Sequence, residues 1–188
     1  MLQIDYYLKG ESILVRTMDV VPYDMKWSFL YEQEKSILIE ILSKIILDIQ
    51  HFGSTSVVGL SAKPIIDIMI LVKDINDVDR YNLSMEKVGY IAKGENDIPN
   101  RRYFVKMKSD YSEKHTHHIH IYEKGNQKAE EELMFRDYLR IDKDAFNEYQ
   151  DLKLELSKRF YTNPTAYTDG KSDCVNRIMN KAKLYYGK

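Results

Sequence analysis

Apolar residues recur at two kinds of spacing along the chain, and these spacings divide it into helices and strands. The helical spacing starts after Ser28, a residue type suited to a helix N-cap, and returns in four later segments. Short alternating or fully apolar runs predict strands. The expected helices run from Ser28 to about Ile45 and over Asn76–Val88, Lys128–Arg140, Lys143–Phe160 and Ser172–Tyr185; the expected strands are Ser12–Val20 at an edge, Gln50–Gly53, Ile65–Val72, Arg102–Lys108 and His117–Tyr122.

The order of these elements predicts an α+β fold in two parts, an α/β core over residues 1–124 and helices over residues 125–188. Ile65–Val72 is apolar on both faces apart from Asp67, which is typical of a central strand. Gly125–Gln127 is too short for a flexible linker, and the apolar stripe from Phe146 to Phe160 needs a partner. We therefore expect the last helices to pack on the core and to complete a cleft.

Composition restricts the possible functions. The 188 residues are 44% hydrophobic and carry a net charge of -1, which argues against a protein that coats nucleic acid or an anionic membrane. Cys174 is the only cysteine, which excludes an intrachain disulfide and fits a reducing cytoplasm. The first residues do not resemble a signal peptide, and the apolar stretches are too short or too charged to cross a bilayer. We expect a soluble cytoplasmic protein.

Asp67 poses the main chemical question, because an ionised carboxylate among apolar residues is costly without a partner. A metal ion, a cationic side chain or backbone N–H groups could each compensate it. The choice between these three decides much of the function.

A glycine-serine turn precedes this strand. The backbone of Gly53, together with the hydroxyl groups of Ser54, Thr55 and Ser56, could hold a phosphate at a helix start. An ordinary strand-to-helix turn is the simpler reading, since short Gly-Ser segments are common.

The distance from this turn to Asp67 favours a functional reading. Nucleotidyltransferases of the polymerase-beta type place a strand, a Gly-Ser or Gly-Gly turn, a helix of about ten residues and then a strand whose paired acids hold divalent ions. Asp67 follows Ser54 by 13 positions, in keeping with that layout. The second acid is absent, because Met69 occupies its place and a thioether is a poor ligand for magnesium.

Histidines could supply the missing ligands. On a strand, His118, His120 and Tyr122 share one face, while His117, Ile119 and Ile121 share the other. Side chains two apart lie roughly 7 Å from each other, which allows two imidazoles to meet one ion. A histidine-rich strand that binds nickel or zinc adventitiously is the alternative.

Several basic residues are candidate phosphate ligands. Lys63 precedes the Asp67 strand, Arg101 and Arg102 open a later strand, and Arg136 shares a helix face with Arg140. All could equally be surface charge, and the arginine helix could be a domain contact or a substrate wall.

Together these segments resemble the GrpB family, a nucleotidyltransferase-like group, over nearly the whole chain from about Val15. The matching segments are VVPYDMKW (Val20–Trp27), HFGSTSVVGLSAKPIIDI (His51–Ile68), RRYF (Arg101–Phe104), HHIHIYEKG (His117–Gly125), LMFRDYLR (Leu133–Arg140) and a late lysine near Lys171. The resemblance implies a polymerase-beta-like core with a mixed sheet and a helical tail. It does not imply a particular reaction.

The leading interpretation is a metal-dependent nucleotidyltransferase that uses a nucleoside triphosphate and a small-molecule acceptor. Asp67, His118 and His120 would bind Mg²⁺, Mn²⁺ or Zn²⁺, and Asp67 and Lys63 would be catalytic. The nucleotide's phosphates would contact the glycine-serine turn and two arginines. These nucleotide-binding candidates are Gly53, Ser54, Thr55, Ser56, Arg102 and Arg136. The alternatives are a nucleotide-binding module without catalysis, which Met69 favours, and a metal-dependent hydrolase.

Overall fold

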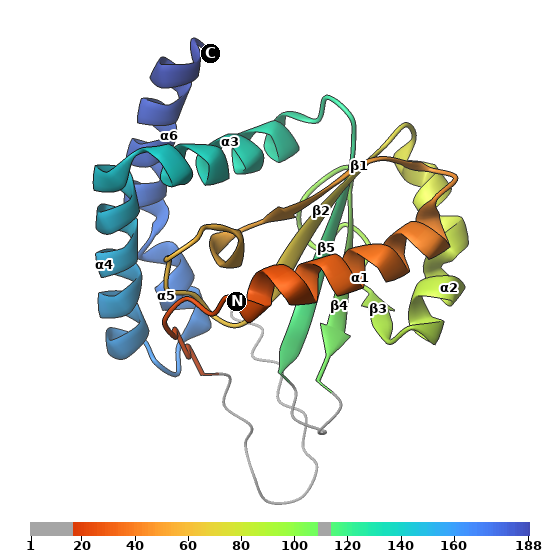
Figure 1. Ribbon diagram of the computed structural model, residues 1–188, viewed down its shortest axis with the longest axis horizontal. Helices are drawn as coiled ribbons and strands as arrows, with labels where there is room; N and C mark the ends of the chain where they lie inside the picture. The colour runs from red at the N-terminus through yellow and green to blue at the C-terminus, as the bar shows by residue number, and fades with distance from the viewer. Residues whose placement is uncertain (1–16, 109–113) are drawn as a thin grey trace, which may run out of the picture.

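One mixed five-stranded sheet organises the protein (Figure 1), which we describe from a computed structural model over residues 17–108 and 114–188. Its strand order is β1-β2-β5-β4-β3. β2 and β5 run parallel, whereas the other neighbouring strands are antiparallel. The strands are β1 (Ile46–Phe52), β2 (Ile66–Val72), β3 (Tyr90–Ala92), β4 (Arg101–Met107) and β5 (His115–Glu123).

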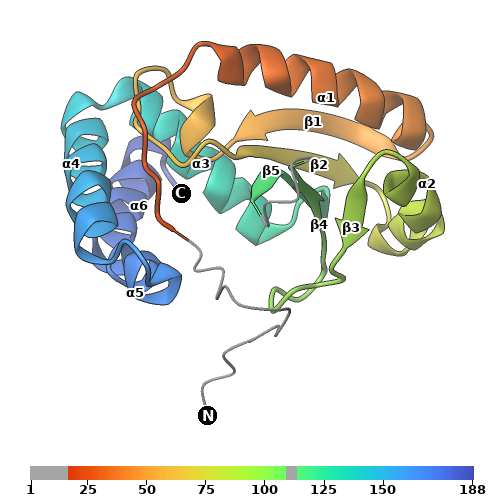
Figure 2. The ribbon, with the colours of Figure 1, turned by 90° about the horizontal axis from the view of Figure 1, so that it is seen from below.

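One face of the sheet carries the main apolar core. The helix α1 (Lys26–Leu42) lies along this face, and η2 (Ile75–Tyr81) and α2 (Asn82–Lys87) cover its far end (Figures 1 and 2). Buried side chains of α1 and α2 pack on the inward-facing apolar residues of β2 and β5, which include Ile66, Ile68, Ile70, Ile119 and Ile121. This packing explains the apolar run that encloses Asp67, because alternate β2 residues belong to this core.

The opposite face is covered by the helix α3 (Gln127–Ile141), which Figure 2 shows on the other side of the sheet from α1. Ala129 and Leu133 of α3 contact Met69 and Tyr122 of the sheet. A third apolar cluster joins α3, α4 (Lys143–Arg159) and α6 (Ser172–Tyr186) to Val57 and Leu60, which follow β1. The late helices therefore pack on the sheet part of the chain, and α5 (Pro164–Asp169) connects α4 to α6.

The long elements agree with the sequence-based expectations, and the differences have local causes. α1 begins at Lys26, two residues before Ser28, because the Asp24 carboxylate accepts a hydrogen bond from the Lys26 N–H at 2.9 Å. The expected helix Asn76–Val88 is instead a 3-10 segment followed by the short α2. β1 begins at Ile46, well before the expected Gln50, and a register shift near its start hides the alternation.

The sequence-based expectations differ from the structure at two short elements and at the expected edge strand near the N-terminus. β3 and α5 were not predicted. Most of the expected edge strand Ser12–Val20 lies outside the described residues; residues 17–20 form no strand, and Val21 makes an isolated bridge to Ala62. Within the described part of the chain, no helix combines the length and apolar character needed to cross a membrane.

Candidate functional site

The register of the parallel strands brings Asp67 and two histidines together. Asp67 pairs with His118 across β2 and β5, and Met69 pairs with His120. Side chains of paired residues point to the same side of a sheet, so Asp67, His118 and His120 share the face that α3 covers. One ligand atom from each of these three residues lies within 4.8 Å of those of the other two.

The contacts within this triad are direct. His118 Nδ1 lies 3.2 Å from Asp67 Oδ1, and its Nε2 lies 2.8 Å from His115 Nδ1. The Asp67 side chain is 26% exposed and that of His118 is 14% exposed, so the group is sheltered but can be reached by solvent. Two imidazoles and a carboxylate form a donor set that suits a transition-metal ion.

His120 is held as a neutral imidazole. Burial lowers the pKa of His120 to about 3, so its ring carries no proton charge at neutral pH. Arg101 Nη1 lies 3.4 Å from His120 Nδ1, and the rings of Phe52 and Tyr103 each lie 4.9 Å from the His120 ring. A neutral ring with a fixed orientation can offer a lone pair to a metal ion.

Gly53 is required by its close approach to Asp67. Its φ of 68° and ψ of -174° define a conformation that L-residues avoid. A Cβ atom at this position would lie 2.5 Å from Asp67 Oδ2. The turn and the carboxylate are therefore in contact.

The three hydroxyl groups after Gly53 have different surroundings. Thr55 donates to the Ile65 carbonyl at 3.2 Å, and Ser56 donates to the Gly53 carbonyl at 2.7 Å. These two bonds stabilise the turn, whereas the Ser54 hydroxyl contacts α4. The expected helix after the turn is only the 3-10 segment η1 (Ser54–Ser56).

Lys153 of α4 faces Ser54. Its side chain is 2% exposed, and its Nζ donates to Ser54 Oγ at 3.1 Å and to the Ser61 carbonyl at 2.5 Å. Burial and, to a smaller extent, the Lys171 ammonium lower the pKa of Lys153 to about 7. Within residues 17–108 and 114–188, no carboxylate forms an ion pair with Lys153.

Lys171, just before α6, is the charged neighbour that lowers the pKa of Lys153. Burial lowers its pKa, while the Asp67 carboxylate acts in the opposite direction. Its Nζ lies over the Tyr167 ring at 4.7 Å, as that of Lys153 lies over the Tyr149 ring at 4.7 Å. Lys153 lies beside the Ser54 hydroxyl, and Lys171 is close enough to lower the pKa of Lys153, so these two sheltered ammonium groups are suited to an anion.

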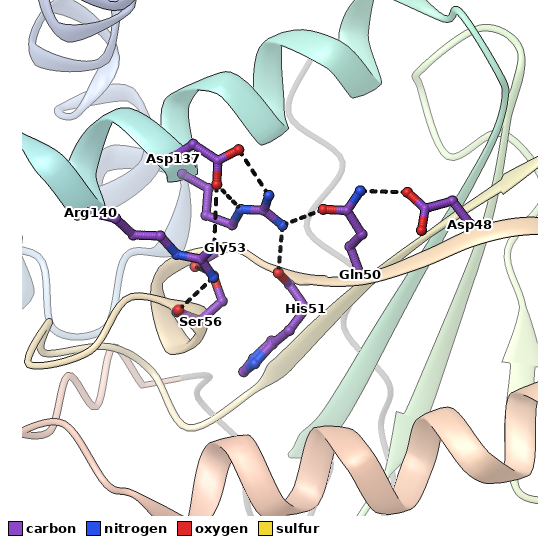
Figure 3. A network of polar contacts seen from close by, with 8 residues as sticks. Asp48, Gln50, His51, Gly53, Ser56, Asp137 and Arg140 are labelled. Carbon is purple, nitrogen blue, oxygen red and sulfur yellow. Dashed lines mark hydrogen bonds and ion pairs between the residues drawn. The ribbon is translucent and has the colours of Figure 1, made fainter.

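Arg136 fixes α3 to β1. Its Nη1 donates to Gln50 Oε1 at 2.8 Å and to the His51 carbonyl at 2.9 Å, and Nε donates to Asp137 at 2.8 Å. Figure 3 shows Asp137 and Arg140 of α3 above the end of β1, with Arg140 donating to the Ser56 carbonyl at 3.0 Å. The two arginines thus position the turn, in agreement with the domain-contact alternative.

The structure does not bring Arg102 to the triad. Arg102 pairs with Ile121 in the sheet, so it points to the face opposite Asp67, and it forms an ion pair with Asp79 at 2.6 Å. Arg101 is the arginine that lies beside His120. Lys63 is half-buried ahead of β2.

Met69 is not an open ligand position. Its side chain is 1% exposed and belongs to the apolar cluster with Phe52, Tyr122 and Ala129. Among the described residues, the hydrogen bond that reaches the Asp67 carboxylate comes from the His118 ring, and the turn N–H groups of Ser56 and Val57 bond to carbonyls of the turn itself. The backbone explanation for Asp67 therefore has no support from these contacts.

The sequence did contain a signal for Lys153. The apolar stripe of its helix includes Tyr149, Leu152 and Leu156, and Lys153 lies on the same side at helical spacing from Tyr149. A lysine on an apolar face indicates a buried amine, and such amines need a polar partner.

Comparisons with known proteins agree on the family. The GrpB protein family matches residues 17–181. YqkA from Bacillus subtilis (strain 168) is 38% identical over 170 residues, which cover 90% of this chain and 48% of that protein, so the chain spans about half of its length. The glutamate-rich protein GrpB from Alkalihalophilus pseudofirmus is 33% identical over 174 residues, which cover 92% of this chain and 97% of that protein.

Solved structures agree on the fold. The crystal structure of GrpB from Enterococcus faecalis has a TM-score of 0.84 and 34% identity, and covers 90% of this chain and 100% of that one. The Cid1 poly(U) polymerase has a TM-score of 0.50 at 12% identity, covering 74% of this chain and 43% of that one, which relates the folds alone. The chain therefore belongs to the GrpB family and has a polymerase-beta-like nucleotidyltransferase fold, with a mixed sheet and C-terminal helices.

Proposed function

We propose that the protein is a metal-dependent nucleotidyltransferase that transfers a nucleotidyl group from a nucleoside triphosphate to a small-molecule acceptor. One observation carries this proposal: a metal-suited triad lies against a glycine-serine turn whose Ser54 hydroxyl accepts a hydrogen bond from the buried Lys153. The nucleotidyltransferase-like fold agrees with it.

The donor set fits a divalent cation. Asp67 supplies one negative charge, and His118 and His120 supply imidazole nitrogens within 4.8 Å of the carboxylate oxygen. Nitrogen ligands favour Zn²⁺, Mn²⁺ or another transition ion over Mg²⁺. When bound, such an ion would neutralise charge that develops on the transferred phosphoryl group.

The other side of the turn fits the phosphates. The Ser54 hydroxyl and the Lys153 ammonium, 3.1 Å apart, would bind phosphate oxygens together with Lys171. The conformation of Gly53 lets the backbone come close to the ligand. A triphosphate would bring negative charge to two lysines whose pKa values are lowered mainly by burial, and would so stabilise their charged forms.

Met69 favours a second candidate, a nucleotide-binding protein without catalysis. The superfamily pattern puts an acid here, whereas this chain buries an apolar side chain beneath α3. In that case the triad and the lysines would bind a nucleotide without promoting transfer.

Product analysis with α-labelled ATP, CTP, GTP and UTP separates the two candidates. Each would be incubated with Mn²⁺ or Zn²⁺ and a small-molecule extract, for the wild type and for Asp67→Asn. We expect a labelled adduct and pyrophosphate from the wild type, and loss of both from Asp67→Asn, since the amide offers the ion no charge. Asp79→Asn, on the opposite face, is the matched control and should retain the activity.

Nucleotide binding without any labelled product would reject transfer and support the binding protein. Labelled nucleoside monophosphate with water as the only acceptor would instead identify a hydrolase. Binding is measured by isothermal titration in the same buffers.

A further inference from the structure

A cavity of about 310 Å³ opens beside the turn, between Gly53–Ser54 and the helices α3, α4 and α6. Phe52, Phe135 and Tyr149 give it aromatic walls, and Glu132 of α3 also lines it. Ligand pockets in proteins occupy about 300–1,000 Å³, so this one suits a small molecule rather than a polymer.

Glu132 stands out among the acidic residues of α3. Glu130 pairs with Lys188 at 3.1 Å and Glu131 pairs with Lys183 at 2.8 Å. Among the residues that the structure describes, the ion pair of Glu132 is the long one of 3.8 Å between its Oε1 and Lys128 Nζ. Its buried Oε2 has no hydrogen-bond partner among the described residues.

A second polar atom lies unpaired at the same part of the sheet. The Tyr122 hydroxyl is also buried without a hydrogen-bond partner in the described part of the chain. Burial and, after it, the Glu132 carboxylate raise the pKa of Tyr122, while the neighbouring Arg101 acts in the opposite direction. Leaving buried polar atoms unpaired is costly, and such atoms concentrate where a ligand supplies the missing bond.

The electrostatic surroundings of Glu132 connect it to the metal triad. Burial raises the pKa of Glu132 to about 7, Lys128 and Arg101 oppose this shift, and Asp67 adds to it. The carboxylate therefore exchanges its proton near neutral pH, as a general base must, and it lies within electrostatic reach of Asp67.

We infer that this cavity binds the acceptor and that Glu132 is the general base, a role that rests on the proposed nucleotidyl transfer. The acceptor is a small molecule with a hydroxyl nucleophile. Its oxygen forms a bond to the α-phosphorus, the bond from that phosphorus to the bridging oxygen breaks, and pyrophosphate leaves with the electron pair. The hydroxyl proton moves to the Glu132 carboxylate.

The variant Glu132→Gln tests this assignment, with ATP and Mn²⁺ as the donor pair and with water, glycerol and putrescine as acceptor probes. Glu130→Gln is the matched control, because Glu130 is exposed on the same helix and pairs with Lys188. Circular dichroism and thermal unfolding establish that both variants fold. Binding of ATP is titrated separately from the rates of pyrophosphate release and of nucleotidyl transfer to the acceptor.

We expect Glu132→Gln to bind ATP within three-fold of the wild type but to cleave and transfer about 10²–10⁴-fold more slowly, the usual contribution of a general base. Unchanged rates in Glu132→Gln, loss of ATP binding in this variant, or transfer by the wild type to putrescine alone would each overturn the inference. If the wild type bound no nucleotide, or bound ATP without cleaving it, the proposed function itself would fail.

Discussion

The contact between Gly53 and Asp67 links the proposed phosphate-binding turn to the proposed metal triad. Replacing Gly53 by alanine places a Cβ 2.5 Å from Asp67 Oδ2 and strains the backbone. We expect Gly53→Ala to lower the free energy of unfolding by about 1–3 kcal/mol and to weaken Mn²⁺ binding by displacing the carboxylate. Denaturant unfolding and metal titration measure the two effects.

Gly94→Ala is the control for this change. Gly94 also has a positive φ, of 60°, but a Cβ there meets no atom within 4 Å. The variant Gly94→Ala should have a somewhat lower free energy of unfolding than the wild type and should keep the wild-type metal affinity. Equal metal affinity in Gly53→Ala and the wild type would contradict the proposed dependence of Asp67 on this glycine.

Lys153 should stabilise a bound anion, but its burial should lower the free energy of unfolding of the protein without the anion. Its pKa of about 7 lies below the ordinary 10.5, so folding releases a proton between these values. Stability should therefore rise with pH from about 7 to 10.5, and the full penalty should remain below pH 7. Lys153→Met removes the penalty, and we expect its free energy of unfolding at pH 6.5 to rise by about 1–4 kcal/mol.

The same variant should bind inorganic pyrophosphate about ten- to hundred-fold more weakly at pH 6.5, because hydrogen bonds to a charged amine are lost. The difference between the two proteins should narrow as pH rises and the wild-type amine deprotonates. Lys158→Met, on the exposed side of the same helix, is the control. Pyrophosphate affinity that is independent of Lys153 would refute an anion site here.

Residue types and spacing predicted part of the geometry of the candidate site. Glycine, aspartate and the alternating histidines follow local rules, so strand periodicity was enough to place His118 and His120 on one face. The partners of Arg102 and Arg136 could not be predicted, since Asp79 and Gln50 come from distant segments. Glu132 was missed because helical spacing alone does not identify which charged side chain loses its solvent.

At the scale of elements, the parallel pairing of β2 and β5 sets the geometry of the triad, and Met69 belongs to the packing beneath α3. We expect Met69→Leu to change stability by less than about 1.5 kcal/mol and to leave metal affinity within three-fold. Met69→Asp should destabilise the protein markedly, because it buries a carboxylate among Phe52, Tyr122 and Ala129. Thermal unfolding with and without Mn²⁺ measures both variants.

A strong stabilisation of Met69→Asp by Mn²⁺, beyond that of the wild type, would contradict this account and indicate a vacant second-acid position.

The elements themselves were predictable where they are long, since α4 and α6 repeat their apolar spacing over many turns. β3 and α5 are too short to show a period.

At the scale of the whole molecule, the late helices complete the site rather than form an attached module. Lys153 bonds to Ser54 and Ser61, and Arg136 bonds to β1. We expect limited proteolysis to release no stable fragment of residues 1–124, and the separately expressed fragment to show no cooperative unfolding, because Val57 and Leu60 would lose their apolar partners. A folded fragment 1–124 would contradict this dependence.

The central claim is that Asp67, His118 and His120 hold a cation beside phosphates bound at Gly53–Ser54. A crystal structure with Mn²⁺ and a non-hydrolysable ATP analogue tests it most directly, because anomalous scattering locates manganese independently. The account predicts a peak about 2.0–2.2 Å from ligand atoms of all three residues, with phosphate oxygens in contact with Ser54 and Lys153. Manganese elsewhere, or the analogue bound away from this turn, would contradict it.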